Sequence, residues 1–449
     1  MFQRHRQAFL DHMEDGDIAL FQGASLMVRN HDVDFPLRQQ SGFWYLTGLP
    51  EAEGALMLAK GVDGVAEETL FVLPRDLSKE TWHGRRLGPE GAMEKLGFAD
   101  ARENDEFEHV VSAAMAKANR VWCRLGEQAE LDAFVLESLA TLRKQARLGL
   151  TPPSSVLDPG PVLDELRLFK SQDELNLMRR AAAISAEAHM LAMSQCNPGM
   201  YEHQLEALLH FTFRNHGCND AGWAYPSIVA SGGNACILHY TENNQACADG
   251  DLVLIDAGGE FQHYAADITR CFPVNGKFSP AQRDVYQVVL DAQVAAVDAV
   301  RAGTPFHDIH DLASLKLCEG LVSMGVVKTS VEEALESGSF RKWTIHNTSH
   351  WIGLDVHDCG AYRFDGVSRP LEPDMVLTVE PGLYFAPDDE SIPSELRGIG
   401  VRIEDDVHVT GGVPENLTVA TPKTIADVEQ ACAAERVAPP TLESAGITK

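Results

Sequence analysis

The C-terminal half of the chain contains acidic and histidine residues that could together hold divalent cations. They are Asp256, Asp267, His350, Glu380 and Glu404. Most lie within or at the end of a short apolar run, such as DLVLIDAGGE or MVLTVEPGLYF. Carboxylates with one imidazole are hard ligands that suit cations of the Mn²⁺ type, and the set is too rich in carboxylates for a structural zinc. If these side chains converge, the sequence predicts a metal-dependent hydrolase.

Asp256 and Asp267 flank the segment AGGEFQHYAA, in which Gly258–Gly259 begins a turn. If the flanking strands pair in an antiparallel hairpin with its tip near Phe261–Gln262, the two aspartates lie opposite each other. Opposed side chains on one sheet face are about 5 Å apart at Cβ, so the carboxylates repel unless a cation separates them. Two solvated acids are the alternative. Because Asp256 ends the apolar run LVLI, and an unpaired buried carboxylate is costly, we favour the ligand interpretation.

Glu380 and Glu404 are acids within otherwise apolar runs. Arg402 precedes Glu404 by two residues and is therefore expected on the same strand face. This spacing predicts a salt bridge between them, or an arginine that orients a metal-binding Glu404. The two interpretations are compatible.

Histidines are dense in the run HNTSHWIGLDVHD, which contains His346, His350 and His357. A single histidine is more often structural than functional, but three beside four acids of apolar strands favour a functional site. His350 is the best ligand candidate. His239, in CILHYTENN, is equally compatible with a satisfied core histidine and an active-site group. Motifs of other enzyme classes, GxSxG, GxxxxGK[ST], HExxH and GxGxxG, are absent from the sequence.

Bulk composition restricts the remaining possibilities. At 449 residues the chain is long enough for two or three domains, and its net charge of −29 makes it a poor nucleic-acid binder that anionic membranes would repel. The nine cysteines are scattered without a CxxC pair, which predicts reduced thiols in a cytoplasmic protein. The N-terminus lacks the apolar core of a signal peptide, and no apolar run is long enough to span a bilayer.

The order of expected helices and strands predicts a mixed α/β protein. Residues 1–165 alternate helical and strand-like runs and predict an α/β domain, and the proline-rich stretch TPPSSVLDPGP (151–161) predicts a linker. Ser171 and Glu174 form a capping-box pattern that opens a long alanine-rich helix. The ligand candidates fall mostly on expected strands of a second domain, 166–430, and we expect residues 431–449 to be a poorly ordered tail. Those strands are 225–229, 252–256, 265–272, 376–380 and 400–409.

The five ligand candidates, separated by gaps of 11, 83, 30 and 24 residues, resemble the ligand set of the dinuclear metallopeptidases of the pita-bread fold. The runs HNTSHWIGLDVHD, LTVEPGLYF and GIGVRIEDD are similar to those of the Xaa-Pro aminopeptidases, also called aminopeptidases P. Two N-terminal stretches, RNHDVDFPLRQQSGFWYLTGLPEAEG and TWHGRRLG, resemble bacterial members. The resemblance therefore covers nearly the whole chain except its tail.

This resemblance implies an N-terminal creatinase/prolidase-like α/β domain, serving substrate access and oligomerisation, and a C-terminal pita-bread catalytic domain. It implies two divalent metal ions, with Mn²⁺ fitting best. Asp256 would bind one ion, Asp267 and Glu404 would bridge both, and His350 and Glu380 would complete the second. The implied reaction releases the N-terminal residue of peptides with proline second, by a hydroxide that bridges the metals. A dimer or tetramer is also implied.

Further residues match the family's site positions. Glu380 would transfer protons, His357 and His239 would stabilise the oxyanion, and Arg402 would support the ligands. His346, Tyr384 and Trp82 match substrate-binding positions, and in tetrameric relatives the tryptophan reaches a neighbouring subunit's site. A substrate-facing arginine also belongs to the family pattern. The segment AYRFDGVSRP is one residue longer than is usual, so Arg363 and Arg369 are both candidates for this arginine.

Three other functions share part of this sequence pattern. A prolidase, which acts on Xaa-Pro dipeptides and has organophosphate hydrolysis as a side activity, shares the fold and metals, but it usually carries a longer insertion between the positions of Glu380 and Glu404. A non-catalytic pita-bread binding module would have lost its ligands, and all five are present here. Creatinase hydrolyses without metals and lacks these ligands.

Overall fold

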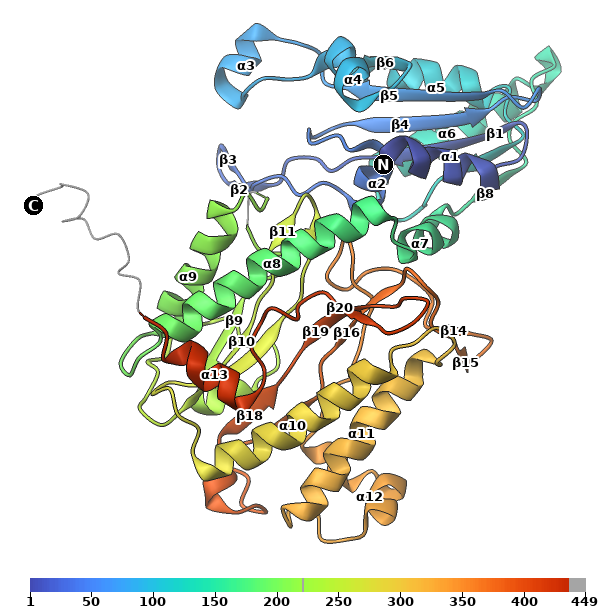
Figure 1. Ribbon diagram of the computed structural model, residues 1–449. Coiled ribbons are helices and arrows are strands. Elements are labelled where there is room, and N and C mark those ends of the chain that lie inside the picture. Colours follow the sequence, from blue (N-terminus) through green and yellow to red (C-terminus); the bar gives the residue numbers. More distant parts are fainter. Residues whose placement is uncertain (220–221, 436–449) are drawn as a thin grey trace, which may run out of the picture. The chain divides into compact units, whose positions relative to one another are not determined.

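The computed structural model describes residues 1–219 and 222–435 (Figure 1). The chain forms two compact units, Met1–Arg167 and Leu168–Lys449, which we call the N-terminal and C-terminal units. The last described helix, α13 (Ile425–Cys432), extends two residues into the expected tail, and 436–449 lie outside the described residues. No helix among the described residues is both long and apolar enough to cross a bilayer.

The N-terminal unit is built on a mixed six-stranded sheet with the order β6-β5-β4-β1-β7-β8. Its strands are β1 (Asp17–Gln22), β4 (Ala55–Lys60), β5 (Ala66–Val72), β6 (Asp100–Glu103), β7 (Arg120–Trp122) and β8 (Ser155–Leu157). Its helices are α1 (Phe2–His12), α2 (Ser41–Thr47), α3 (Leu77–His83), α4 (Gly88–Leu96), α5 (Phe107–Met115), α6 (Ala129–Lys144) and α7 (Gly160–Leu168), the last ending at the unit boundary. Side chains of α5 and α6 form a core with β1, β4, β5 and β7. The stretch 151–161, expected to be a linker, instead contains β8, which pairs in parallel with β7.

Long helices border the strands of the C-terminal unit (Figure 1). They are α8 (Gln172–Gln195), α9 (Glu202–Asn215), α10 (Pro280–Ala299) and α11 (Phe306–Ser323), with the short α12 (Val331–Ser337) after them. The predicted capping box is present at the start of α8, where the Glu174 carboxylate accepts a hydrogen bond from the Ser171 backbone N–H at 2.7 Å. The buried alanines of α8 let this helix pack closely against the unit's strands.

Several small sheets, rather than one, carry the candidate ligands. A three-stranded sheet has the order β13-β10-β9, a second the order β16-β19-β20, and β17 pairs with β18. These strands are β9 (Ile228–Ser231), β10 (Leu252–Asp256), β13 (Thr269–Pro273), β16 (Val376–Val379), β17 (Gly382–Phe385), β18 (Ile399–Arg402), β19 (Asp405–His408) and β20 (Glu415–Asn416). The expected single strand 400–409 is therefore two strands in different sheets, and Glu404 lies at the break between them.

The hairpin that carries the two aspartates is antiparallel, as expected, but its register differs from the predicted one. Strands β11 (Glu260–Phe261) and β12 (Tyr264–Ala265) turn through Gln262–His263, which both have positive φ, and Asp256 pairs with Thr269. The predicted pairing of Asp256 with Asp267 is therefore wrong, because the residue opposite Asp256 lies two positions further along the chain. Because side chains alternate with a period of two, this shift keeps both carboxylates on the same face.

Candidate metal centre

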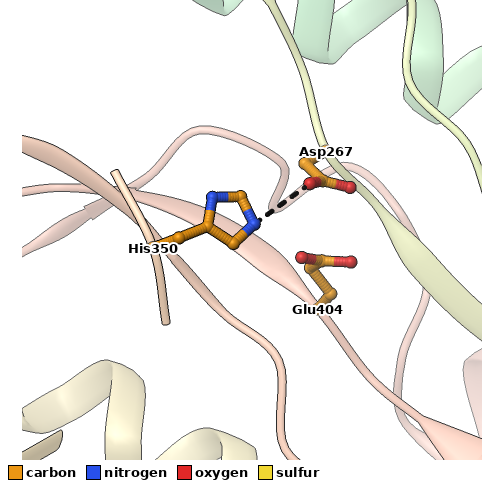
Figure 2. A group of neighbouring side chains, drawn as sticks. All are labelled: Asp267, His350 and Glu404. Atoms are coloured by element: carbon orange, nitrogen blue, oxygen red, sulfur yellow. Dashed lines mark ion pairs between the residues drawn. The ribbon is translucent and has the colours of Figure 1, made fainter. Parts of the chain in front are cut away.

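The structure brings the predicted ligands together from separate parts of the C-terminal unit. Ligand atoms of Asp267, His350 and Glu404 all lie within 4.8 Å of one another (Figure 2). His350 Nε2 is 3.5 Å from Asp267 Oδ2 and 3.5 Å from Glu380 Oε1. Each acid lies where a strand ends or breaks, so its side chain is free of the sheet while its backbone is held.

Asp256 joins this group through Tyr225, which the sequence did not single out. The phenol oxygen of Tyr225 lies 2.6 Å from Asp256 Oδ1 and 2.5 Å from Asp267 Oδ1. A hydroxyl has one proton and can donate to only one of the two carboxylates. The second carboxylate oxygen therefore needs another positive partner.

The charges of the site fit divalent cations. Four carboxylates, Asp256, Asp267, Glu380 and Glu404, line the cavity, and of its two arginines, Arg363 and Arg402, only Arg402 is paired with one of them. Burial raises the pKa of Glu380 to about 7 and, with the neighbouring acids, raises the pKa of Glu404 well above its usual range. Bound cations would remove this penalty.

The orientation of His350 fits the same conclusion. Its Nδ1 lies 3.0 Å from the Trp351 carbonyl oxygen, so Nδ1 carries the proton and Nε2 faces the carboxylates. In the neutral ring Nε2 has a lone pair directed at these acids, which is unfavourable without a proton or a cation. Burial lowers the pKa of His350, but Asp267 and Glu380 outweigh it and raise the pKa to about 9. A divalent cation could take the place of that proton.

Arg402 pairs with Asp256 and not with Glu404. Its guanidinium donates to Asp256 Oδ2 at 2.6 Å, to Thr269 Oγ1 at 3.0 Å and to the Tyr384 hydroxyl at 2.9 Å. The expected salt bridge to Glu404 is therefore wrong. Arg402 reaches Glu404 only through Thr269, whose hydroxyl donates to Glu404 Oε2 at 2.6 Å.

His346 and Tyr384 form one hydrogen-bonded chain with Arg402. His346 Nδ1 lies 2.8 Å from the Asn347 carbonyl oxygen, and His346 Nε2 lies 2.7 Å from the Tyr384 hydroxyl. Burial and the Arg402 charge lower the pKa of His346 to about 4, so this ring is neutral at neutral pH. Its Nδ1 is 3.5 Å from Glu380 Oε2, which places His346 directly beside a ligand candidate.

The ligand candidates open into a cavity of about 890 Å³. His239 and His357 line it, so the interpretation of His239 as a core histidine is wrong. The His357 ring meets the His350 ring edge to face, with centroids 4.5 Å apart, and burial lowers the pKa of His357. Other lining residues are Tyr225, Pro226, Ile228, Leu238, Thr241, Phe306, His307, His310, Asn347, Ser349, Val356, Tyr362 and Ser368.

Two further candidate positions differ in their placement. Arg363 lines the cavity from the hairpin of β14 (Arg363–Phe364) and β15 (Val367–Ser368). Arg369 is buried and donates to Glu372 Oε1 at 3.0 Å. Trp82 lies on α3 of the N-terminal unit, is 84% exposed and is not among the residues that line the cavity.

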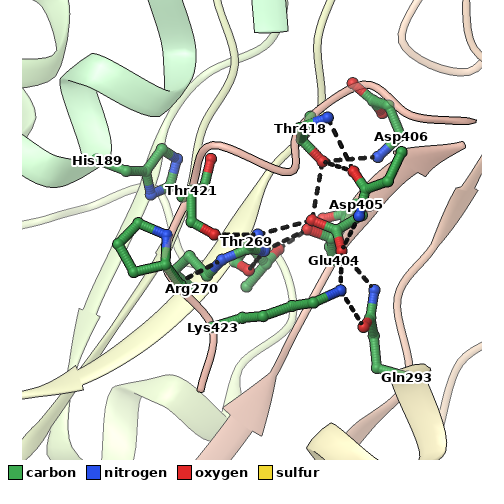
Figure 3. A network of polar contacts seen from close by, with 12 residues as sticks. His189, Thr269, Arg270, Gln293, Glu404, Asp405, Asp406, Thr418, Thr421 and Lys423 are labelled. Carbon is green, nitrogen blue, oxygen red and sulfur yellow. Dashed lines mark hydrogen bonds and ion pairs between the residues drawn. The ribbon is translucent and has the colours of Figure 1, made fainter. Parts of the chain in front are cut away.

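A buried polar network holds the backbone next to Glu404 (Figure 3). Asp405 accepts hydrogen bonds from Arg270, Lys423 and three neutral side chains, Gln293, Asn416 and Thr418. Burial opposes ionisation, but the Arg270 and Lys423 charges hold the pKa of Asp405 well below its usual range. Arg270 also donates to the Glu404 carbonyl oxygen. The sequence signal for this network was the second acid in VRIEDD, which follows directly on a ligand candidate.

Comparison with known proteins identifies the family. Residues 176–411 match the model of metallopeptidase family M24, and residues 2–122 match the aminopeptidase P N-terminal domain. The chain belongs to metallopeptidase family M24. It is 45% identical to Xaa-Pro aminopeptidase of Escherichia coli (strain K12) over 97% of this chain and 98% of the relative. It is 40% identical to the Haemophilus influenzae enzyme of the same name over 95% and 96% of the two chains.

Solved structures agree with this assignment. Aminopeptidase PepP of Pseudomonas aeruginosa superposes with a TM-score of 0.94, at 42% identity over 96% of this chain and 97% of that one. A zinc-substituted E. coli aminopeptidase P in complex with product superposes with a TM-score of 0.93, at 45% identity over 97% and 98% of the two chains. The pita-bread fold, the divalent-metal peptidase class and the preference for Xaa-Pro aminopeptidase over prolidase are thereby confirmed.

Proposed function

We propose that this metallopeptidase removes the N-terminal residue from peptides whose second residue is proline, using two divalent cations. The observation that carries the proposal is the convergence of four carboxylates, two of them buried, and the Nε2 atom of His350 in the wall of a single cavity. Asp256, Asp267, His350, Glu380 and Glu404 would hold the cations. The many carboxylates favour Mn²⁺.

Bound cations would supply a water molecule of lowered pKa and would polarise the substrate carbonyl. Glu380 is placed to accept a proton from the attacking water and to pass it to the proline nitrogen, which leaves as a secondary amine. His357 and His239 line the same cavity and would donate hydrogen bonds to the carbonyl oxygen as it becomes negative, an effect worth about 3 kcal/mol per donor in other hydrolases. Arg402 would hold Asp256 and Tyr384 in place.

Arg363 is the arginine that we assign to the substrate, because it lines the cavity whereas Arg369 is buried beside Glu372. His346 and Tyr384 form the wall next to Glu380 and would contact the peptide there.

We further propose a homo-oligomer. The hairpin of β2 (Val28–Asn30) and β3 (Val33–Asp34) exposes Met27, Val28 and Phe35, and Trp82 is almost fully exposed on α3. Exposed apolar side chains favour contact with another copy, in which Trp82 would approach a neighbour's cavity. The nine cysteines are all free thiols, which fits the cytoplasm.

The test is peptide cleavage by chelated protein with and without added Mn²⁺. Ala-Pro-Ala should be cleaved only with the cation, and Ala-Ala-Ala should be cleaved far more slowly. A Glu380→Gln variant should lose turnover while keeping its circular dichroism spectrum. Cleavage that survives complete chelation, or faster cleavage of the dipeptide Ala-Pro than of Ala-Pro-Ala, would refute the proposal.

A further inference from the structure

A second hollow of about 570 Å³ adjoins the catalytic cavity. Four residues, His307, His310, His346 and Asn347, line both spaces. The others that line the second space are Ser314, Phe340, Arg341, Thr344 and Ile345. They come from the first three turns of α11 and from the segment 340–347. We call this space the Arg341 hollow.

The Arg341 hollow contains no acid, although the chain has 66 of them and a net charge of −29. Arg341 makes no ion pair with any residue of the described chain, whereas the neighbouring Lys342 is paired with Asp389 at 2.8 Å. The nearest acid to a lining residue is the largely exposed Asp311, which lies 3.6 Å from His307 Nε2 but does not itself line the hollow. The two adjoining spaces therefore differ in charge: the first holds four carboxylates beside Arg363 and Arg402, and the second holds the guanidinium of Arg341 and no acid.

The hollow is close to the reaction centre. His346 separates them, with Nδ1 3.5 Å from Glu380 Oε2 and its ring in the wall of the hollow. The C-terminus of a tripeptide lies two residues beyond the bond that is cut, which is roughly 7 Å of extended chain. A short peptide bound at the carboxylates can therefore place its C-terminal carboxylate in the hollow.

We propose that the Arg341 hollow binds the free C-terminal carboxylate of short Xaa-Pro-Xaa peptides and that Arg341 supplies the charge that selects it. This inference rests on the proposed aminopeptidase function. A peptide with free ends carries a positive amine and a negative carboxylate, and the charges of the two spaces match that order. His310 and Thr344 add polar groups to the lining, while burial keeps the His310 ring neutral by lowering its pKa.

The experiment compares Ala-Pro-Ala with its C-terminal amide, which differs only in the terminal charge. For the wild-type holoenzyme we expect kcat/KM to be roughly 2–5-fold higher for the acid, mostly through KM, because a partly exposed charge pair is worth a factor of this size. In Arg341→Gln the acid-to-amide ratio should fall to about 1. The matched control Arg301→Gln, an exposed arginine outside both spaces, should keep the wild-type ratio. Raising the salt concentration should reduce the ratio in the wild type and in Arg301→Gln but not in Arg341→Gln.

Equal cleavage of acid and amide by the wild type, or a preference that persists in Arg341→Gln, would overturn the proposal. If neither peptide is cleaved by any variant, the aminopeptidase function itself fails. Calorimetric binding of Pro-Ala and of its amide then still tests the role of the hollow. The wild type should bind the acid more tightly than the amide, and Arg341→Gln should bind the two equally.

Discussion

A buried ion pair beside the active-site histidines offers the sharpest test of the structure. Lys170 Nζ lies 3.0 Å from Asp358 Oδ2, and both side chains are 1% exposed. Asp358 directly follows His357, and its backbone N–H donates to the Trp351 carbonyl oxygen at 2.9 Å. A Cβ at Gly353 would overlap Asp358 Oδ2 and crowd the end of the Lys170 side chain. The segment between His350 and His357 therefore packs tightly against this ion pair.

We predict that Lys170→Met strongly destabilises the C-terminal unit. At 3.0 Å and an effective dielectric constant of about 20, two unit charges attract by about 5.5 kcal/mol. Removing one partner of a buried ion pair typically costs about 3–5 kcal/mol, because the remaining buried charge is less well compensated. At roughly 2–4 °C per kcal/mol, the unfolding midpoint should fall by roughly 6–20 °C. Calorimetry or urea unfolding followed by fluorescence measures the change.

Two controls separate the charge from the packing. The double variant Lys170→Met/Asp358→Leu removes both charges, so most of the lost stability should return. Lys316→Met removes a partner of the exposed pair Lys316–Glu319, which is 2.8 Å long, and should change the stability by less than about 1 kcal/mol. A loss below 1 kcal/mol in Lys170→Met, or a double variant no more stable than the single one, would show that this ion pair does not hold the segment.

Three more outcomes are expected. Tyr225→Phe removes the hydroxyl between Asp256 and Asp267 and should weaken Mn²⁺ binding roughly 10-fold or more in a chelator competition; unchanged affinity would contradict the geometry. Burial lowers the pKa of His189 from 6.5 unfolded to about 4 folded, so the free energy of unfolding should fall by about 3 kcal/mol as the pH drops from 6.5 to 4. His189→Gln should lack this component in denaturant titrations; the same pH slope in the variant would refute it. Trp82→Ala should increase the monomer fraction in light scattering, and an unaltered mass distribution would argue against its role between copies.

The ligand types could be predicted from the sequence because an acid that ends an apolar strand has few structural uses. Asp256, Glu380 and Glu404 all show this signal, and the structure places all three at one cavity. The hairpin register could not be predicted in the same way. The turn lies at Gln262–His263, whose positive φ values the residue types do not suggest, whereas the Gly258–Gly259 pair suggested an earlier turn. Gly258 is needed instead because a Cβ there would overlap the Ala266 carbonyl oxygen.

The partner of Arg402 was missed for a related reason. The two-residue spacing of Arg402 and Glu404 places both on one face only if the strand is continuous. Strand β18 ends at Arg402 and β19 begins at Asp405 in another sheet, so the arginine turns to Asp256. Tyr225 had no local signal at all, since its role depends on two aspartates from a distant hairpin. Side chains that act through long-range contacts are those that sequence patterns leave unassigned.

The two histidines of the segment 350–357 depend on different parts of the fold. The His350 backbone exchanges hydrogen bonds with Thr378 of β16, so the sheet sets its position. His357 is held through Asp358 and Lys170, which precedes α8. These supports meet at the Trp351 carbonyl oxygen, which accepts from the Asp358 backbone N–H at 2.9 Å and lies 3.0 Å from His350 Nδ1. A change at Lys170 should therefore disturb His350 as well as His357.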